Sequence, residues 1–139
     1  MNGQFVADSS VAIAWAVPSQ SHEGTDRLLE DIAQGAQVVV PVLWFFELAN
    51  SLIVLTRRGR LTSEQCALAR QDVSRLAPLV DEEGHNLALG KIADLAATHS
   101  LSAFDAAYLE LALRRRLPLA SRDAALNKAA RLLGVATLL

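Results

Sequence analysis

The sequence predicts an α/β fold with a mostly parallel sheet, and two features of its pattern lead to this class. Short apolar segments alternate with longer segments of helical spacing along the 139 residues. A helix after each strand returns the chain to the same edge, so that consecutive strands run parallel and helices cover the sheet. The sequence has no internal repeat and no low-complexity linker, so we expect a single domain over residues 1–139.

The candidate strands are short and are bounded by residues that favour turns. Gln4–Ala7 is the first, and the β-branched segment Val38–Val40 lies between Gly35 and Pro41. Three further segments have a similar character: Leu79–Val80, Leu117–Ala120 and the terminal Val135–Leu139. These segments supply the strands of the expected sheet.

The segments between the strands have the spacing and the end signals of helices. Ser9 or Ser10 is a candidate cap for a first helix that Pro18 ends, and Gly59 is placed to end a long one. The later helices are expected at Glu23–Gln34, Leu43–Arg58, from Thr62 to before Pro78, Asn86–His99, Ser102–Arg115 and Asp123–Leu133.

The charge balance and the cysteine content exclude several classes of protein. There are 13 basic and 15 acidic residues, a net charge of -2, so binding of nucleic acid would need local patches or a metal ion. The single Cys66 excludes an intrachain disulfide, and the scattered histidines lack zinc-site spacing. The apolar run Val11–Val17 is too short to span a bilayer, and no basic segment precedes it. We expect a soluble, cytoplasmic protein with no membrane partner.

Four carboxylates in apolar or alanine-rich surroundings are the most informative feature: Asp8, Glu47, Asp105 and Asp123. Asp8 and Asp123 lie where a strand gives way to a helix, at the sheet edge where parallel sheets bind ligands. Glu47 and Asp105 lie in the first turns of their helices and are placed to point at the same edge. Because acids are rarely buried without a partner, a shared divalent cation is the explanation that we favour.

Each acid also has a purely structural explanation. Asp8 and Asp123 have the positions of helix N-caps, and Asp105 follows Ser102 by three residues, as in a capping box. Glu47 is harder to explain in this way, because most of its neighbours are apolar. Taken together, the four acids favour a hard cation such as Mg²⁺ or Mn²⁺ and suit phosphodiester hydrolysis.

Four segments, each containing one of these acids, resemble in order the motifs of PIN-domain proteins, and most of all the VapC ribonuclease toxins of bacterial toxin–antitoxin pairs. The segments are Phe5–Ala12, Val40–Asn50, Leu101–Leu109 and Leu117–Asp123. The resemblance implies a PIN-like three-layer sandwich, with a parallel five-stranded sheet flanked by helices. It also implies Mg²⁺ or Mn²⁺ held by the acids, and metal-dependent endonucleolytic cleavage of RNA.

The resemblance assigns a role to each acid. Asp8 and Asp105 would be the direct ligands of the principal metal, while Glu47 and Asp123 would complete its shell through water or bind a second ion. One carboxylate, or the metal itself, would activate the attacking water. Where some members carry a further acid, this chain has Ala124-Ala125-Leu126, so occupation of a second metal position stays open.

Two polar residues are candidate supports of this site. Ser121 stands where threonine is more usual in the family, and its hydroxyl would orient Asp123. Asn50 is three residues after Glu47 on the same helix face and would line the site. A buried amide that only packs the helix is the alternative for Asn50.

Two groups of arginines are candidates for contact with the RNA backbone: Arg57 and Arg58 with Arg60, and Arg114 and Arg115 with Arg116. Favourable interaction with helix C-terminal dipoles is the structural alternative for both groups. From the resemblance we also expect a homodimer face and a groove for a VapB-like antitoxin. An arginine of that antitoxin would replace part of the metal's positive charge.

Two other functions stay open at the level of the sequence. Asp8 after a first strand also suits a phosphotransferase that forms an aspartyl phosphate, but Ser10 occupies the place of the second acid of such enzymes. Neither Lys91 nor Lys128 lies at a strand end, where a phosphate-binding lysine would be expected. The other alternative is a catalytically silent binding module with the PIN fold, although such modules usually lack one or more of the acids.

Overall fold

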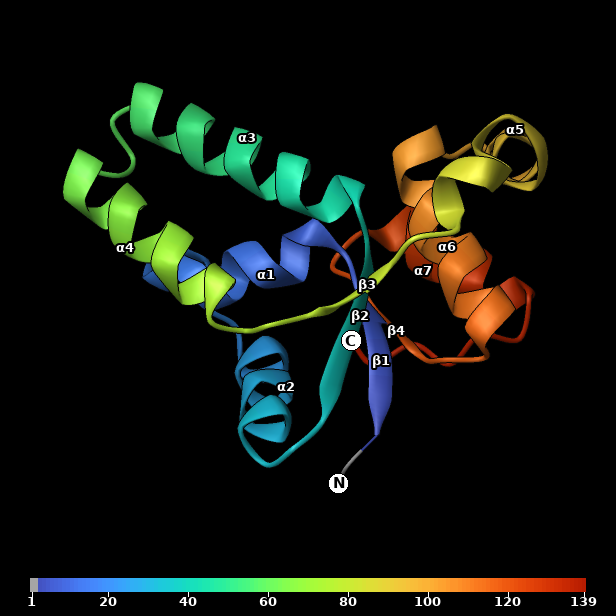
Figure 1. Cartoon of the computed structure of the whole chain (residues 1–139), viewed down its shortest axis with the longest axis horizontal. Coiled ribbons are helices and arrows are strands. Elements are labelled where there is room, and N and C mark those ends of the chain that lie inside the picture. Colours follow the sequence, from blue (N-terminus) through green and yellow to red (C-terminus); the bar gives the residue numbers. More distant parts are fainter. Residues whose placement is uncertain (1–2) are drawn as a thin grey trace.

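The computed structural model describes residues 3–139, in which a central sheet is covered by helices on both faces (Figure 1). The strands are β1 (Gln4–Ala7), β2 (Gln37–Pro41), β3 (Leu79–Asp81) and β4 (Leu119–Ala120). Their order in the sheet is β3-β2-β1-β4, and every neighbouring pair is parallel. The predicted α/β class, with a parallel sheet between helices, is confirmed.

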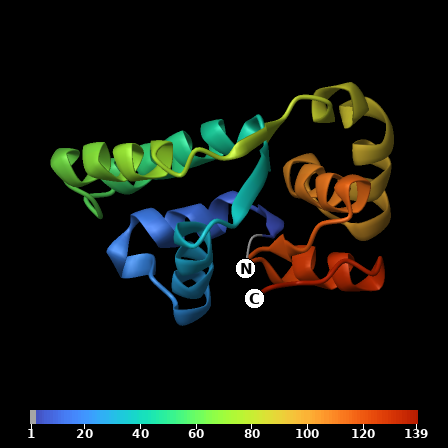
Figure 2. The same ribbon diagram turned by 60° about the horizontal axis from the view of Figure 1, so that its bottom comes forward.

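The helices form two outer layers, which Figures 1 and 2 show on opposite sides of the strands. One layer contains α1 (Ser9–Ala16), α2 (Glu23–Ala33), α3 (Leu43–Arg57) and α4 (Ser63–Ser74). The other contains α5 (Ala93–His99), α6 (Ala103–Arg115) and α7 (Ala124–Leu132). Within residues 3–139, none of these helices has the length and apolar character that crossing a membrane requires.

The two inner strands, β1 and β2, are largely buried because helices cover both of their faces. Val39 and Val40 of β2 and Val6 and Ala7 of β1 have no exposed surface. This explains why the strands are continuous apolar runs and not alternating patterns. α3 packs onto the same core through residues four apart, Trp44 and Leu48, which are also buried.

The predicted fifth strand is reduced to a single bridge. Of the segment Val135–Leu139, only Thr137 pairs with the sheet, in parallel with Leu119. The Leu119 N–H donates to the Ala136 carbonyl, and the Leu138 N–H donates to the Leu119 carbonyl, each at 2.9 Å. Because β4 has only two residues, it offers too few free backbone groups for a longer ladder.

The predicted helix Asn86–His99 is also divided. A 3₁₀ turn at Gly84–Leu87 and a π turn at Ala88–Ile92 precede α5. Gly90 interrupts the helical geometry, with φ -112° and ψ -106°. The chain therefore kinks at Gly90, and this kink divides the predicted helix into shorter pieces.

Asp81, at the end of β3, is the centre of an ion-pair network that the sequence did not indicate. Its carboxylate is 2% exposed and accepts hydrogen bonds from both terminal nitrogens of Arg114, at 2.9 and 2.7 Å. Arg115 Nη2 donates to the same carboxylate at 2.9 Å, and Arg114 Nε donates to the buried Glu110 at 2.8 Å. Hydrogen bonding from Arg114 lowers the pKa of Asp81 to about 2. The network therefore fastens the edge strand β3 to α6.

Asp81→Asn should lower the free energy of unfolding at pH 7 by about 2–3 kcal/mol, because Arg114 and Arg115 lose a charged partner. Urea unfolding followed by circular dichroism measures the difference. Glu83→Gln is the matched control. The Glu83 carboxylate lies 3.6 Å from Arg114 but is 75% exposed, so its removal should cost less than about 0.5 kcal/mol.

The stabilisation by Asp81 should also depend on pH with a definite sign. Its pKa is about 2 in the folded protein, below the ordinary value of 3.8. The stabilisation is therefore present above about pH 4 and lost as the pH falls toward 2. If the wild type and Asp81→Asn differed in stability by the same amount at pH 7 and pH 2, this role for Asp81 would be wrong.

Candidate active site

The candidate site lies where the carboxyl ends of β1 and β4 meet. From β1 the chain continues to β2 and β3 on one side and later returns to β4 on the other, so the topological switch point lies between β1 and β4. Asp8 follows β1 directly, and its N–H donates to the Ala120 carbonyl at 3.1 Å. Ser121 follows β4 directly. The parallel pairing thus brings two polar residues from distant parts of the chain side by side.

Asp8 is buried and is surrounded by hydrogen-bond donors. Its Oδ1 accepts from the Ser10 hydroxyl and, at 3.3 Å, from the Val11 N–H. Its Oδ2 accepts from the Ser121 hydroxyl. The Val11 bond makes Asp8 the N-cap of α1, so its structural explanation is realised. Burial raises the pKa of Asp8, and the two serine hydroxyls act in the opposite direction.

Glu47 lies beside the packing face of α3 and is half-buried. The Tyr108 hydroxyl of α6 donates to its Oε1 at 2.6 Å. Burial raises the pKa of Glu47, and the charges of Asp105 and Asp8 raise it further. The Tyr108 contact was not predicted, because it joins residues on two helices. The one hint in the sequence is that Tyr108 lies one turn after Asp105.

Asp105 is half-buried in the first turn of α6. Its backbone N–H donates to the Ser102 hydroxyl oxygen at 3.0 Å, so Ser102 caps the helix as the pattern predicts. Burial raises the pKa of the Asp105 carboxyl, and the charges of Asp123 and Asp8 add to this effect.

Asp123 is exposed and caps α7, since its Oδ2 accepts from the Leu126 N–H at 2.8 Å. Its backbone N–H donates to the Ser121 hydroxyl oxygen at 3.0 Å. Because that same hydroxyl donates to Asp8, Ser121 links the first and the last acid. Asn127 supports the turn by donating to the Ser121 carbonyl at 2.9 Å. The expected Ser121–Asp123 contact therefore involves the Asp123 backbone, while the carboxylate that Ser121 orients is that of Asp8.

The acids form an electrostatic cluster, but their side chains as they lie do not form a closed coordination shell. Among residues 3–139, no group of three or more His, Cys, Asp or Glu side chains is placed to hold a metal ion. Within the same range, none of the ion pairs involves any of the four acids. Their donor chemistry, hard carboxylate oxygens with unbalanced negative charge, does fit Mg²⁺ or Mn²⁺. Asp8, Glu47, Asp105 and Asp123 are the residues that could hold such an ion.

The candidate RNA-binding arginines are distant from this cluster in the fold or already engaged. Arg57 and Arg58 are exposed at the far end of α3. Arg114 and Arg115 hold Asp81, which leaves fewer of their N–H groups for a phosphate. Their contact with RNA stays a prediction.

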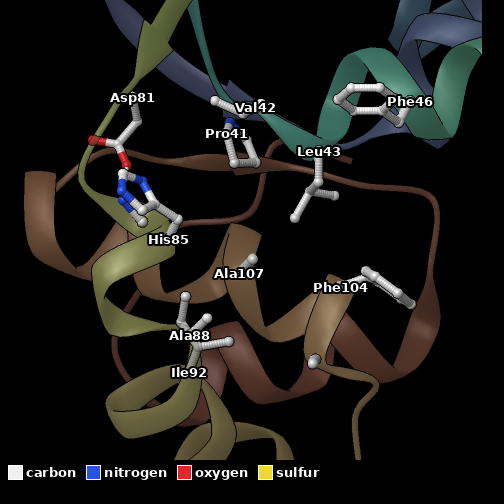
Figure 3. A pocket seen from close by; sticks show the side chains of 12 residues that line it. Pro41, Val42, Leu43, Phe46, Asp81, His85, Ala88, Ile92, Phe104 and Ala107 are labelled. Atoms are coloured by element: carbon white, nitrogen blue, oxygen red, sulfur yellow. Dashed lines mark hydrogen bonds between the residues drawn. The ribbon is translucent and has the colours of Figure 1, made fainter.

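Two hollows adjoin the acids. One, of about 390 Å³, lies between α3 and α6 and is mostly apolar. Figure 3 shows Leu43 pointing into it, with Phe46 and Phe104 on one side and Asp81 and His85 on the other. The second, of about 650 Å³, is more polar than the first, although aliphatic side chains also line it; Asn50, one turn after Glu47 on α3, is part of its lining.

The sequence model of the PIN domain family matches residues 5–132. The chain therefore belongs to the PIN domain family, and the resemblance seen in the sequence is confirmed at this level. A comparison with curated protein sequences finds no match.

Solved structures share the fold over nearly the whole chain. PAE2754 from Pyrobaculum aerophilum has 19% identity and a TM-score of 0.71, over 99% of this chain and 92% of that one. FitAcB from Neisseria gonorrhoeae has 20% identity and a TM-score of 0.63, over 96% and 95%. VapBC2 from Rickettsia felis, bound to a DNA fragment from their promoter, has 10% identity and a TM-score of 0.65, over 96% of each chain. At these identities the likeness shows the fold.

Tyr108→Phe should raise the pKa of Glu47 further, because the charged carboxylate loses a hydrogen bond that favours it. Titration of the side-chain carboxyl carbon by ¹³C NMR measures this shift in metal-free protein. Asp81, which pairs with Arg114 and Arg115, is the internal control, and its pKa should stay at about 2. Identical titration curves for Glu47 in both proteins would contradict the assigned contact.

Proposed function

We propose that this chain is a metal-dependent endoribonuclease and the toxin of a VapBC-type toxin–antitoxin module. One observation supports this above all: acids from four separate segments meet at one edge of the sheet, where burial and neighbouring charge raise the pKa of Glu47 and Asp105. PIN domains are generally nucleases, and such a cluster suits phosphodiester hydrolysis. RNA as the substrate, and the cytoplasm as the place of action, follow from the likeness to VapC toxins.

In this proposal the four acids hold Mg²⁺ or Mn²⁺, which would stabilise charge on the phosphoryl oxygens and lower the pKa of a bound water. Asp8 is kept in one orientation by Ser10 and Ser121, so its charge is fixed before substrate arrives. Glu47 takes the proton of the attacking water. Tyr108 holds Glu47 in position.

The aspartyl-phosphate alternative has less support. Such enzymes carry a second acid where this chain has Ser10, and the Ser10 hydroxyl donates to Asp8. No specific observation favours the silent binding module over the nuclease.

A VapB-like antitoxin would bind the apolar hollow between α3 and α6. Phe46 and Phe104 at its side are 72% and 61% exposed, which is unusual for large apolar side chains that line one hollow. Each directly precedes one of the acids, Glu47 or Asp105. A segment that covers these phenylalanines would therefore also obstruct the acids. A homodimer of the toxin remains part of the proposal, through its likeness to VapC proteins.

Asp8→Asn should reduce the rate of RNA cleavage in Mn²⁺ or Mg²⁺ by at least about a hundredfold, because the metal loses a charged ligand. The assay is gel analysis of a labelled RNA, with and without EDTA. Asp26→Asn makes the same change of charge at an exposed position of α2 and should cleave as fast as the wild type. Undiminished metal-dependent cleavage by Asp8→Asn would refute the assignment.

The same variants should separate loss of metal from loss of fold. Mn²⁺ should raise the melting temperature of the wild type and of Asp26→Asn but not that of Asp8→Asn. Without metal, Asp8→Asn should be at least as stable as the wild type at pH 7. Burial raises the pKa of Asp8, so its charged form is destabilising there.

Phe46→Ser should weaken inhibition by the cognate antitoxin at least about tenfold while leaving cleavage unchanged. The reason is the loss of an aromatic anchor that the complex would bury. The antitoxin to test is a small protein encoded immediately upstream, and titration of the cleavage assay gives its affinity. Ile53→Ser is the control, since Ile53 is 43% exposed on the same helix but lies outside the hollow. Equal inhibition of both variants would place the antitoxin elsewhere.

A further inference from the structure

The polar cleft beside the acids is lined by residues from four parts of the chain. Ser9 and Ser10 come from α1, Gln20 from the short turn after it, Asn50 and Ser51 from α3, and Arg122 from the segment after β4. The cleft adjoins the acids along the chain, because Ser9 directly follows Asp8 and Arg122 directly precedes Asp123. Its volume of about 650 Å³ is in the range of ligand sites.

Arg122 is the one charged side chain among the residues that line this cleft. Its backbone N–H donates to the Ser10 hydroxyl oxygen at 3.1 Å, and Ser10 in turn donates to Asp8. The backbone of Arg122 is therefore fixed to the same serine that orients the first acid. Its Nη1 donates to the Gln20 carbonyl at 3.2 Å. This bond uses one of the five N–H groups of a guanidinium, which can also bind a phosphate in a bidentate manner.

The lining indicates which part of a nucleic acid would bind. It contains hydroxyls and amides from serine, asparagine and glutamine, together with aliphatic side chains, but no aromatic residue. Bases of a single strand are usually held by stacking on aromatic side chains. Hydroxyls, amides and arginine instead contact phosphates and sugars. The cleft therefore suits the sugar–phosphate backbone.

The charges near the cleft also indicate that it suits the sugar–phosphate backbone. The carboxylates repel a polyanion, and a bound dication would offset this repulsion at the phosphate that is cut. The neighbouring phosphate needs a cation of its own, and Arg122 is placed to supply it at the edge of the cluster. This differs from the arginines expected from the sequence, since Arg114 and Arg115 are committed to Asp81.

We infer that the cleft between α1 and α3 binds the backbone of a single-stranded RNA next to the bond that is cut, with Arg122 contacting a phosphate that is not cut. Asn50 and Ser51 lie on the same wall and offer partners for a ribose hydroxyl. The inference rests on the proposed nuclease function, whose site it adjoins.

The test measures RNA binding apart from cleavage. A fluorescein-labelled single-stranded RNA of mixed sequence is titrated at several salt concentrations with the Asp8→Asn protein, whose acid cluster carries one negative charge less, and anisotropy gives the dissociation constant. Adding Arg122→Gln should weaken binding about tenfold and reduce the slope of log K against log salt by about 0.7, the value for one phosphate contact on a single strand. Arg122→Lys should keep the slope but lose part of the affinity.

Arg27→Gln is the control for net charge. Arg27 is exposed on α2, pairs with Glu23 at 3.4 Å and makes the same change of charge when replaced. Its effect on RNA affinity should stay within about twofold. If Arg122→Gln and Arg27→Gln weaken binding equally, or if the RNA does not bind, the inference is overturned.

Cleavage by proteins that retain Asp8 distinguishes this inference from the proposed function. Arg122→Gln should act mainly on KM, because the contact is made before and during the reaction alike. Active cleavage with RNA binding that is indifferent to Arg122 would reject the inference and leave the nuclease in place. If binding depends on Arg122 but the protein cuts no RNA, the cleft still binds RNA and the proposed nuclease function is rejected.

Discussion

The parallel pairing of β1 with β4 is the constraint on which the candidate site depends. It joins segments whose polar residues are 113 positions apart and places the Ser121 hydroxyl against the Asp8 carboxylate. At the carboxyl ends of these two strands the sheet reverses its order, which leaves a crevice that neither crossover covers. α3 and α6 then bring Glu47 and Asp105 to the crevice from the two layers of helices. Without the β1–β4 pair, the four acids would have no common edge.

Burying carboxylates at this edge destabilises their charged forms, and the surrounding hydrogen bonds do not fully offset this effect. Hydroxyl and backbone donors hold Asp8, and Tyr108 holds Glu47, yet burial still raises the pKa of both. Asp81 shows the contrast within the same sheet. There two arginines lower the pKa of a carboxyl in a residue that is as buried as Asp8. The acid that only holds the fold together is thus paired with arginines. Among residues 3–139, the clustered acids have no arginine or lysine as an ion-pair partner. This difference is what a site for an external cation requires.

The two hollows give the surroundings of the cluster opposite characters. Along one helix, Phe46 faces an apolar hollow and Asn50 a polar cleft, with Glu47 between them in the sequence. A protein segment and a nucleic-acid backbone would therefore find different surfaces next to the same acids. Under the proposed function, competition between them at the acids would be sufficient for an antitoxin to inhibit cleavage, without a change of fold.

Much of this organisation was predictable from local sequence. The strand Gln4–Ala7 and the helices around Leu43 and Ser102 follow from apolar runs and capping residues, which act over a few positions and need no tertiary information. The candidate acids were recognisable because a carboxylate in an apolar run is costly wherever the chain goes. The terminal strand was overestimated, since its length depends on how much of β4 is left free to pair.

The tertiary structure alone decided the partners of these residues. Nothing near Arg114 in the sequence indicates Asp81, and nothing near Glu47 indicates Tyr108, because hydrogen bonds between separate elements depend on how layers pack. The same holds for Arg122, which the sequence presents as one arginine among many and the fold places in a cleft beside Asp8. Composition and spacing determined which chemical groups this protein has and which elements carry them. Packing determined which of the charged groups have a partner of opposite charge and which do not, since burial and distance set the strength of every electrostatic interaction.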